Sequence, residues 1–197
     1  MKYRRRTVSV RFFVLVVFAG HKSFYATFGT AGFIQISNKP LKVIKCGGTG
    51  SDSLNPDMPK TGHARFETGS INSVSIAGLN AGIDWVLAHD IYTREKELTE
   101  YLIDKLGQVD KVHVYLPEAK DRIFGLVSIS VDGYLAGDVG SILDEEYEIC
   151  VRTGYHCSPY IHDFLGSIIH GGTVRISMSA FTTREEINSL VDALATL

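Results

Sequence analysis

Residues 172–187 read GTVRISMSAFTTREEI and connect a strand directly to a helix. Val174 and Ile176 alternate with polar residues in 173–179, as in a strand with one apolar face. Residues 183–186, Thr-Arg-Glu-Glu, form a capping box, in which a threonine and a glutamate together cap a helix start. The helix that follows carries an apolar stripe inward: Ile187, Leu190, Val191 and Leu194. This unit predicts helices covering a small sheet.

Strand and helix signals also alternate before this unit. Strands are expected at 112–115, 123–131 and 149–152, and a helix at about 138–148. The fold class is therefore α/β, with an α+β C-terminal domain.

Two helices are expected ahead of these strands. The chain enters the first after residue 65, with one apolar face made of Ile76, Leu79, Ile83 and Val86 or Leu87. The second is capped by Thr93 and ends at Gly107, with an apolar stripe made of Leu98, Tyr101, Leu102 and Leu106. No glycine- or proline-rich linker separates the two helices, so a domain boundary near Ile91 is a hinge.

The composition is that of a globular protein. The 197 residues are 45% hydrophobic and 21% charged, which is enough for one sizeable core or two small ones. A net charge of −2 predicts neither a nucleic-acid partner nor an anionic membrane partner. Cys46, Cys150 and Cys157 match neither a disulfide framework nor a CxxC metal site, which favours a reducing cytoplasm.

The N-terminal segment allows two interpretations. A basic run at 2–6 precedes the apolar run at 12–19, which is the order of a secretory signal. An apolar run that ends in Gly20 is also typical of a buried parallel strand. We favour the strand, because no clear small-x-small cleavage site follows.

Cys157 lies in a sequence that favours a reactive thiol. Arg152 and His156 place cations and hydrogen-bond donors near it, which favours the nucleophilic thiolate. Gly154 and Pro159 bracket the segment and predict a loop rather than a core strand. The alternative is a free cysteine that acts as a small hydrophobic residue.

Lys22 and Arg175 each have a functional and an ordinary interpretation. Lys22 follows the apolar run, where a partly desolvated amine becomes a nucleophile; otherwise its side chain extends to solvent. Arg175 on a rigid strand can grip a carboxylate with two donors, although strand arginines commonly face solvent. The glycine-rich residues 47–51 lack the ending of a P-loop. Cys157 and the nearby histidines have no recognised metal-ligand spacing, so no metal is expected.

Five segments carry a family resemblance from about residue 16 to the C-terminus. They resemble, in order and spacing, the cysteine desulfurases of the class V aminotransferase family. The Arg-x-Gly-x-His-Cys form is similar to the branch that includes sulfur-mobilising desulfurases and selenocysteine lyases. The segments are GHK at 20–22, FETGSIN at 66–72, RTGYHC at 152–157, GTVRIS at 172–177 and FTTREEI at 181–187.

The resemblance implies a role for each candidate residue. Lys22 carries pyridoxal 5'-phosphate, abbreviated PLP, and Cys157 accepts sulfur as a persulfide. His21, Gly69 and Ser70 contact the cofactor, with Ser70 reaching the phosphate from the partner subunit. The substrate site is made of Arg175, which holds the carboxylate, together with Arg152 and His156.

The resemblance also implies a fold and partners. The fold is PLP-transferase-like, with residues 16–92 as the C-terminal part of the large domain and 93–197 as the complete small domain. The substrate is L-cysteine or selenocysteine, and alanine is the product. A homodimer, a sulfur-acceptor protein and a place in iron–sulfur cluster assembly complete the expectation, without nucleic acid or membrane.

Several departures from the family pattern modify this expectation. Ala19 replaces a frequent serine, and Ser70 and Ile71 replace the usual Thr-Pro, so phosphate binding is expected to be weaker. Residues 1–15 do not match the family, and nothing before Lys22 supplies the ring-stacking group or the aspartate for the pyridinium nitrogen. We therefore expect a truncated chain with an incomplete cofactor pocket. The alternatives are a related PLP aminotransferase or selenocysteine lyase, or an inactive fragment that acts as a non-catalytic module. Cys157 distinguishes a desulfurase from an aminotransferase, because transamination does not need this thiol.

Overall fold

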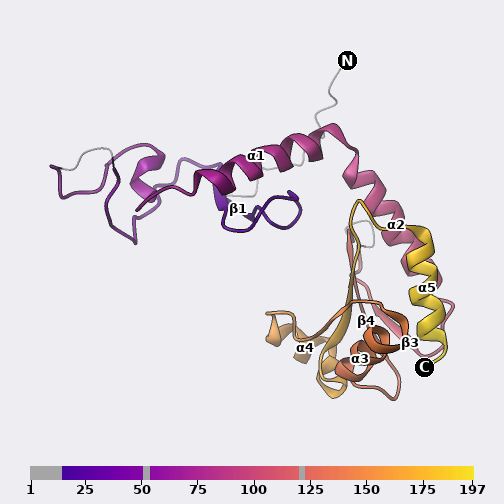
Figure 1. The fold of residues 1–197 in the computed structure, drawn as a ribbon. Coiled ribbons are helices and arrows are strands. Elements are labelled where there is room, and N and C mark those ends of the chain that lie inside the picture. Colours follow the sequence, from indigo (N-terminus) through magenta and orange to yellow (C-terminus); the bar gives the residue numbers. More distant parts are fainter. Residues whose placement is uncertain (1–14, 51–53, 120–122) are drawn as a thin grey trace. The chain divides into compact units, whose positions relative to one another are not determined.

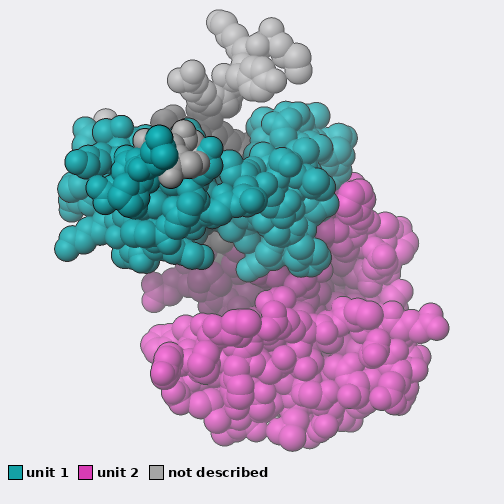
Figure 2. Space-filling view, turned by 60° about the vertical axis from the view of Figure 1, so that its left-hand side comes forward, with its two compact units in different colours: residues 1–89 teal, residues 90–197 magenta. Residues whose placement is uncertain are grey.

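The computed structural model describes residues 15–50, 54–119 and 123–197. It divides into two compact units, residues 1–89 and 90–197, which Figure 2 colours separately. The basic run at 2–6 and the signal-peptide alternative lie outside the described residues. Among the described helices, none is both long and apolar enough to cross a bilayer.

Unit 1 contains a two-stranded antiparallel sheet and one long helix (Figure 1). Strand β1 (Leu15–Ala19) pairs with β2 (Ala31–Gln35), and Ala19 lies opposite Ala31. A short 3-10 helix, η2 (His63–Phe66), precedes α1 (Ser73–Ala88).

The described part of the first strand is not the buried parallel strand that the sequence predicts. It pairs antiparallel with β2, and Val16 and Val17 are 38% and 71% exposed. The prediction is wrong because residues 20–30 turn the chain back on itself, and this connection is shorter than the crossover that a parallel pair needs. A two-stranded sheet also leaves much of its surface uncovered.

Helix α1 buries small residues, and the predicted apolar stripe is only partly covered. Ser75 and Gly82 are its buried residues. Leu79, Ile83 and Val86 are half-buried, whereas Ile76 and Leu87 are 46% and 71% exposed. The Ser75 hydroxyl donates to the Phe28 carbonyl at 2.9 Å. A Cβ added at Gly82 would strike the carbonyl oxygen of Phe24. The backbone of the β1–β2 connection thus approaches α1 too closely for a large side chain.

Unit 2 is a four-stranded antiparallel sheet with order β3-β4-β6-β5. Figure 1 shows α5 beside α2, and the two helices are in contact. The elements are α2 (Ile91–Leu106), β3 (Val112–Tyr115), β4 (Leu126–Val131), α3 (Ala136–Tyr147), β5 (Arg152–Gly154), α4 (Pro159–Leu165), η4 (Ser167–His170), β6 (Thr173–Ser177) and α5 (Arg184–Ala195).

The core of unit 2 lies between one face of this sheet and helices α2, α3 and α5. Val127 pairs with Ile176 and Ile129 with Val174, so these four side chains share one face and all are buried. The helices contribute Leu102, Leu106, Val139, Leu143, Leu190 and Leu194. The alternation that buries these residues places polar side chains on the opposite face.

The capping box is confirmed. The backbone N–H of Thr183 donates to Oε2 of Glu186 at 2.7 Å, and the N–H of Glu186 donates to the Thr183 hydroxyl at 3.2 Å. Ile187, Leu190 and Leu194 are buried, as the stripe predicts.

Two other boundaries differ from the prediction. Asp90, not Thr93, caps α2, and its carboxylate accepts from the Thr93 N–H at 3.3 Å, because the helix begins three residues earlier. The strand expected at 149–152 runs from Arg152 to Gly154 instead. The N–H of Ile149 is occupied by the Leu143 carbonyl at 2.8 Å, in the C-terminal cap of α3, so the sheet ladder begins later.

Candidate active site

A row of polar side chains crosses the open face of the unit 2 sheet. Tyr115 lies opposite Ser128, Ser128 opposite Arg175, and Arg175 opposite Arg152, so one register line joins all four strands. Directly opposed residues share a sheet face and have closely spaced Cβ atoms. The Cβ atoms of Arg152 on β5 and Arg175 on β6 are therefore close together, and both side chains leave the same face.

Arg175 retains an unused donor in this row. Its Nε is buried, and no described residue accepts a hydrogen bond from it. A buried donor without a partner is costly, so the site favours an anionic ligand that would accept from Arg175.

Cys157 lies on a turn that follows β5, and the loop position predicted from the sequence is confirmed. Gly154, His156 and Cys157 have φ angles of 93°, 51° and 64°, in the left-handed region. Helix α4 begins directly afterwards, with Pro159 at its first position. This path leaves the Cys157 side chain exposed.

Arg152 contacts the cysteine sulfur. Its Nη2 lies 3.2 Å from Sγ of Cys157 and is the donor of that hydrogen bond. A guanidinium presents charged N–H donors, so this contact places the cysteine sulfur beside a positive group.

His156 points toward β6. Its Nε2 lies 3.0 Å from the carbonyl oxygen of Thr173 and 2.9 Å from the Thr173 hydroxyl. Burial lowers the pKa of His156 below its ordinary value of 6.5; the charges of Arg175, Arg152 and His162 lower it further, while the bond to the Thr173 backbone opposes the shift. The imidazole is therefore neutral near pH 7.

The neutral ring has one defined tautomer. A carbonyl only accepts, so Nε2 carries the hydrogen and Nδ1 has a free lone pair. Nδ1 is buried and has no hydrogen-bond partner in the described chain.

Lys22 occupies the turn between β1 and β2. The N–H of Tyr25 donates to the Lys22 carbonyl at 2.9 Å, and the N–H of Ala26 donates to the Gly20 carbonyl at 3.1 Å. The Lys22 side chain is exposed, so within unit 1 it takes the solvent-facing alternative. His21 is also exposed and stacks on Phe28, with ring centroids 4.7 Å apart.

Gly69 and Ser70 lie just before α1. The Gly69 N–H donates to the Gly48 carbonyl at 2.7 Å, and Ser70 is exposed. Two residues later, Asn72 caps α1, and its amide would lie 2.8 Å from a Cβ added at Gly29. The start of α1 is thus packed against the end of the lysine turn.

The structure joins the predicted residues in two groups. Arg152, His156, Cys157 and Arg175 belong to unit 2, whereas Lys22, His21, Gly69 and Ser70 belong to unit 1. No three His, Cys, Asp or Glu side chains in 15–50, 54–119 and 123–197 gather as a metal site. Sequence reasoning missed Thr173, whose only signal is its place two residues before Arg175 on the same strand face.

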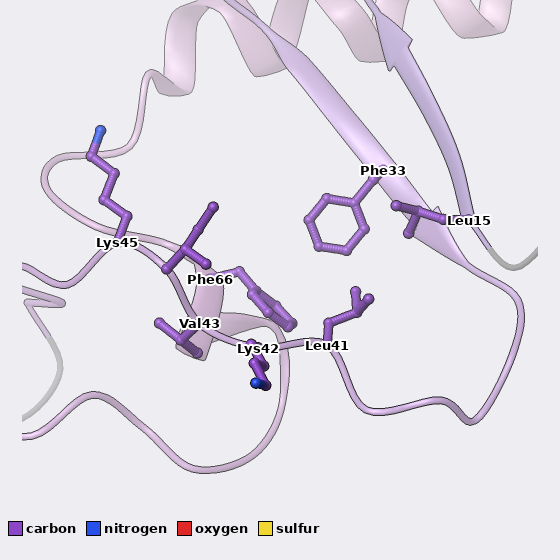
Figure 3. Close-up of a pocket in the computed structure, with 8 residues that line it drawn as sticks. Leu15, Phe33, Leu41, Lys42, Val43, Lys45 and Phe66 are labelled. Carbon is purple, nitrogen blue, oxygen red and sulfur yellow. The ribbon is translucent and has the colours of Figure 1, made fainter.

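A separate cavity of about 320 Å³ lies within unit 1 (Figure 3). Phe33 and Phe66 pack there edge to face, with centroids 5.4 Å apart. Its lining is mostly apolar and includes none of the candidate site residues: Leu15, Phe33, Leu41, Lys42, Val43, Ile44, Lys45 and Phe66.

Comparison with known proteins identifies the family. The sequence pattern of the Aminotransferase class-V family matches residues 6–190, and the chain belongs to this family. It is 32% identical over 185 residues to the probable cysteine desulfurase of Methanothermobacter thermautotrophicus, covering 90% of this chain and 46% of that protein.

Solved structures give the same result. The apo cysteine desulfurase of Thermococcus onnurineus NA1 matches with a TM-score of 0.78 at 28% identity, covering 93% of this chain and 46% of that one. A C-DES mutant with glycine covalently linked to the PLP cofactor matches with a TM-score of 0.65 at 26% identity, covering 90% and 44%. The fold is thus that of PLP-dependent cysteine desulfurases. The chain spans from about a quarter to just under half the length of the curated relatives it matches.

The family implies PLP as cofactor, and the described residues fit its aldehyde end. The Lys22 turn is fixed by backbone hydrogen bonds while its primary amine is exposed, which suits condensation with an aldehyde. The His21 imidazole and the exposed Ser70 hydroxyl are donors of the kind that a phosphate accepts.

Proposed function

We propose that this chain is part of a PLP-dependent cysteine desulfurase, which removes sulfur from L-cysteine as a persulfide on Cys157 and releases L-alanine. The observation that carries the proposal is the 3.2 Å contact between Nη2 of Arg152 and Sγ of an exposed Cys157. Transamination gives no role to such a thiol. Family membership and the structural neighbours support the same reaction.

Lys22 and Arg175 make the main contacts to cofactor and substrate in this proposal. Lys22 holds PLP through its amine, with His21, Gly69 and Ser70 as further contacts. When bound, the cofactor supplies an electron sink for bonds at the substrate Cα. Arg175 holds the substrate carboxylate, and its unpartnered Nε supports this role. The Lys22 amine moves the Cα proton.

Cys157 performs the sulfur transfer. Its thiolate attacks the substrate sulfur, so an S–S bond forms and the substrate C–S bond breaks. The electron pair of the C–S bond remains on carbon, which gains a proton and becomes the methyl group of alanine. The proton that the Cys157 thiol loses balances the proton that the carbon gains, and no external oxidant is needed.

The division into units supports a domain assignment. We assign residues 16–92 to the large, cofactor-binding domain and 93–197 to the small domain that carries Cys157. The proposal further includes a homodimer, a sulfur-acceptor protein and a role in iron–sulfur cluster assembly. Three free cysteines suit the reducing cytoplasm.

The test is alanine release from L-cysteine by the purified chain with PLP, with and without a thiol reductant. Cys157→Ser is expected to abolish alanine release, whereas Cys150→Ser, at another exposed cysteine of unit 2, is expected to preserve it. Equal release by Cys157→Ser would refute the proposed role of Cys157, and absence of alanine from the unsubstituted chain would favour the inactive fragment.

A further inference from the structure

The turn that carries Cys157 is held in an unfavourable backbone conformation. His156 and Cys157 are consecutive non-glycine residues with positive φ, at 51° and 64°. L-residues visit this region as single residues and at a cost in free energy. Contacts from outside the turn must therefore stabilise it.

His156 provides the first of these contacts. Its Nε2–H bonds Thr173, which is only 1% exposed and paired with Gly154 in the β5–β6 ladder. The bond therefore connects the turn to one of the most deeply buried positions of the sheet.

Two glycines beside the turn allow the hydrogen bond between His156 and Thr173. A Cβ added at Gly172 would overlap the backbone of Gly154, so the chain before β6 passes directly against the end of β5. Gly154 and Gly172 have φ angles of 93° and 106°. This approach brings Thr173 within reach of the His156 ring.

A second buried histidine lies near the His156 ring. His162 is 2% exposed, and its Nδ1 lies 2.8 Å from the Ser167 hydroxyl. The His162 ring centroid lies 6.0 Å from that of His156 and 5.1 Å from that of Tyr155. His156 thus has a buried, hydrogen-bonded neighbour in addition to its acceptor on Thr173.

The surroundings of His156 disfavour its protonated form. Burial is the largest cause that lowers its pKa, and the nearby Arg175 and Arg152 act in the same direction. A group that resists protonation is a poor acceptor for the proton of Cys157. The side chain that contacts the sulfur is Arg152.

We propose that His156 is a positioning residue: by binding Thr173 it locks the left-handed turn that places Cys157 against Arg152, and it does not take the cysteine proton. Its catalytic consequence rests on the proposed function, because only a desulfurase needs this thiol. The positioning itself can be measured without cofactor or substrate.

The experiment measures the alkylation rate of Cys157 by iodoacetamide in the whole chain between pH 5 and 9. Mass spectrometry of peptides resolves the site, so Cys46 and Cys150 serve as internal references. His156→Ala and His156→Gln are compared, because both lose histidine but only glutamine retains an N–H that can reach the Thr173 carbonyl. His113→Ala, at an exposed histidine of β3, is the matched control.

His156→Ala is expected to slow alkylation at pH 7 by about tenfold, as loss of one charge-assisted hydrogen bond to sulfur predicts. His156→Gln is expected to restore the rate to within about threefold, with a pH profile like that of the unsubstituted chain. His113→Ala should change nothing. Thr173→Val, which retains the carbonyl acceptor, should have a small effect, and it remains informative if His156→Ala does not fold.

Two results would overturn the inference. Equal slowing and an equal shift of the pH profile in His156→Ala and His156→Gln would mean that His156 acts through its own titration. An unchanged rate in His156→Ala would mean that it does not position the turn. If the chain releases no alanine but the variants show the expected alkylation rates, that result counts against the desulfurase proposal and leaves the positioning role of His156 in place.

Discussion

Arg152 and Arg175 lie directly opposite each other on β5 and β6, with their side chains on the same face of the sheet. Like charges at opposed positions destabilise a sheet, so this pair favours an anion between or above them. Arg152 contacts the Cys157 sulfur, and Nε of Arg175 has no partner in the part of the chain that the structure describes. The proposed function assigns the sulfur to Arg152 and the substrate carboxylate to Arg175.

The first prediction concerns stability against pH. The lowered pKa of His156 means that the unfolded chain binds more protons than the folded chain below about pH 6.5, the ordinary histidine value. The free energy of unfolding should therefore be flat above this pH with respect to His156 and fall as the pH drops through 6.5 toward the folded pKa. Urea denaturation at pH 5 to 8 measures it.

His156→Gln should remove this part of the pH dependence, because glutamine does not titrate. His113→Ala, at the exposed histidine of β3, serves as the control. A slope between pH 5 and 6.5 that is identical in the unsubstituted chain and His156→Gln would contradict the assignment.

The second prediction concerns the packing of α1 on the lysine turn. Gly82→Ala places a methyl group against the Phe24 carbonyl oxygen, so the turn that carries Lys22 must move. The expected cost is about 1–3 kcal/mol, as for other overpacked sites. Gly137→Ala is the control: a Cβ there has no neighbour within 4 Å, and alanine favours the helix by about 0.5–1 kcal/mol.

Thermal unfolding of the two variants provides the measurement. The midpoint should fall in Gly82→Ala and remain or rise in Gly137→Ala. A midpoint that rises equally in both would show that Gly82 is not a close-contact position.

The sequence was sufficient to predict most of unit 2, for identifiable reasons. The alternation of Val174 and Ile176 and the capping box at Thr183 are local signals, and both are present in the structure. Strand register is not local. The row that places Ser128 and Tyr115 beside Arg175 depends on how β3, β4 and β6 align, so sequence reasoning missed both residues.

In unit 1, the buried face of α1 was harder to predict from the sequence. Ile76 and Leu79 have helical spacing, but spacing does not specify which face another segment will cover. The small residues Ser75, Gly78 and Gly82 are also spaced for one helix face, and a glycine face signals close backbone approach. The spacing of these small residues is visible in the sequence, but the prediction followed the apolar residues instead.

The third prediction tests the capping box of α5. Thr183→Ala removes the acceptor of the Glu186 N–H at 3.2 Å and should cost about 1 kcal/mol of unfolding free energy. Ser141→Ala, at an exposed position of α3, should be nearly neutral. Urea denaturation distinguishes them, and equal midpoints would mean that the cap does not stabilise the unit.

The last prediction tests carboxylate binding by Arg175. Arg175→Met retains much of the side-chain volume but removes the donors, so kcat/KM for alanine release from L-cysteine should fall by roughly 10- to 100-fold, as loss of a charged hydrogen-bonding partner predicts. The loss should appear mainly in KM if the carboxylate contact is equal in ground and transition states. Arg184→Met is the control, because that guanidinium lies over the Tyr101 ring at 4.9 Å in α5. A fall that is equal in the two variants, or confined to Arg184→Met, would remove Arg175 from the substrate site.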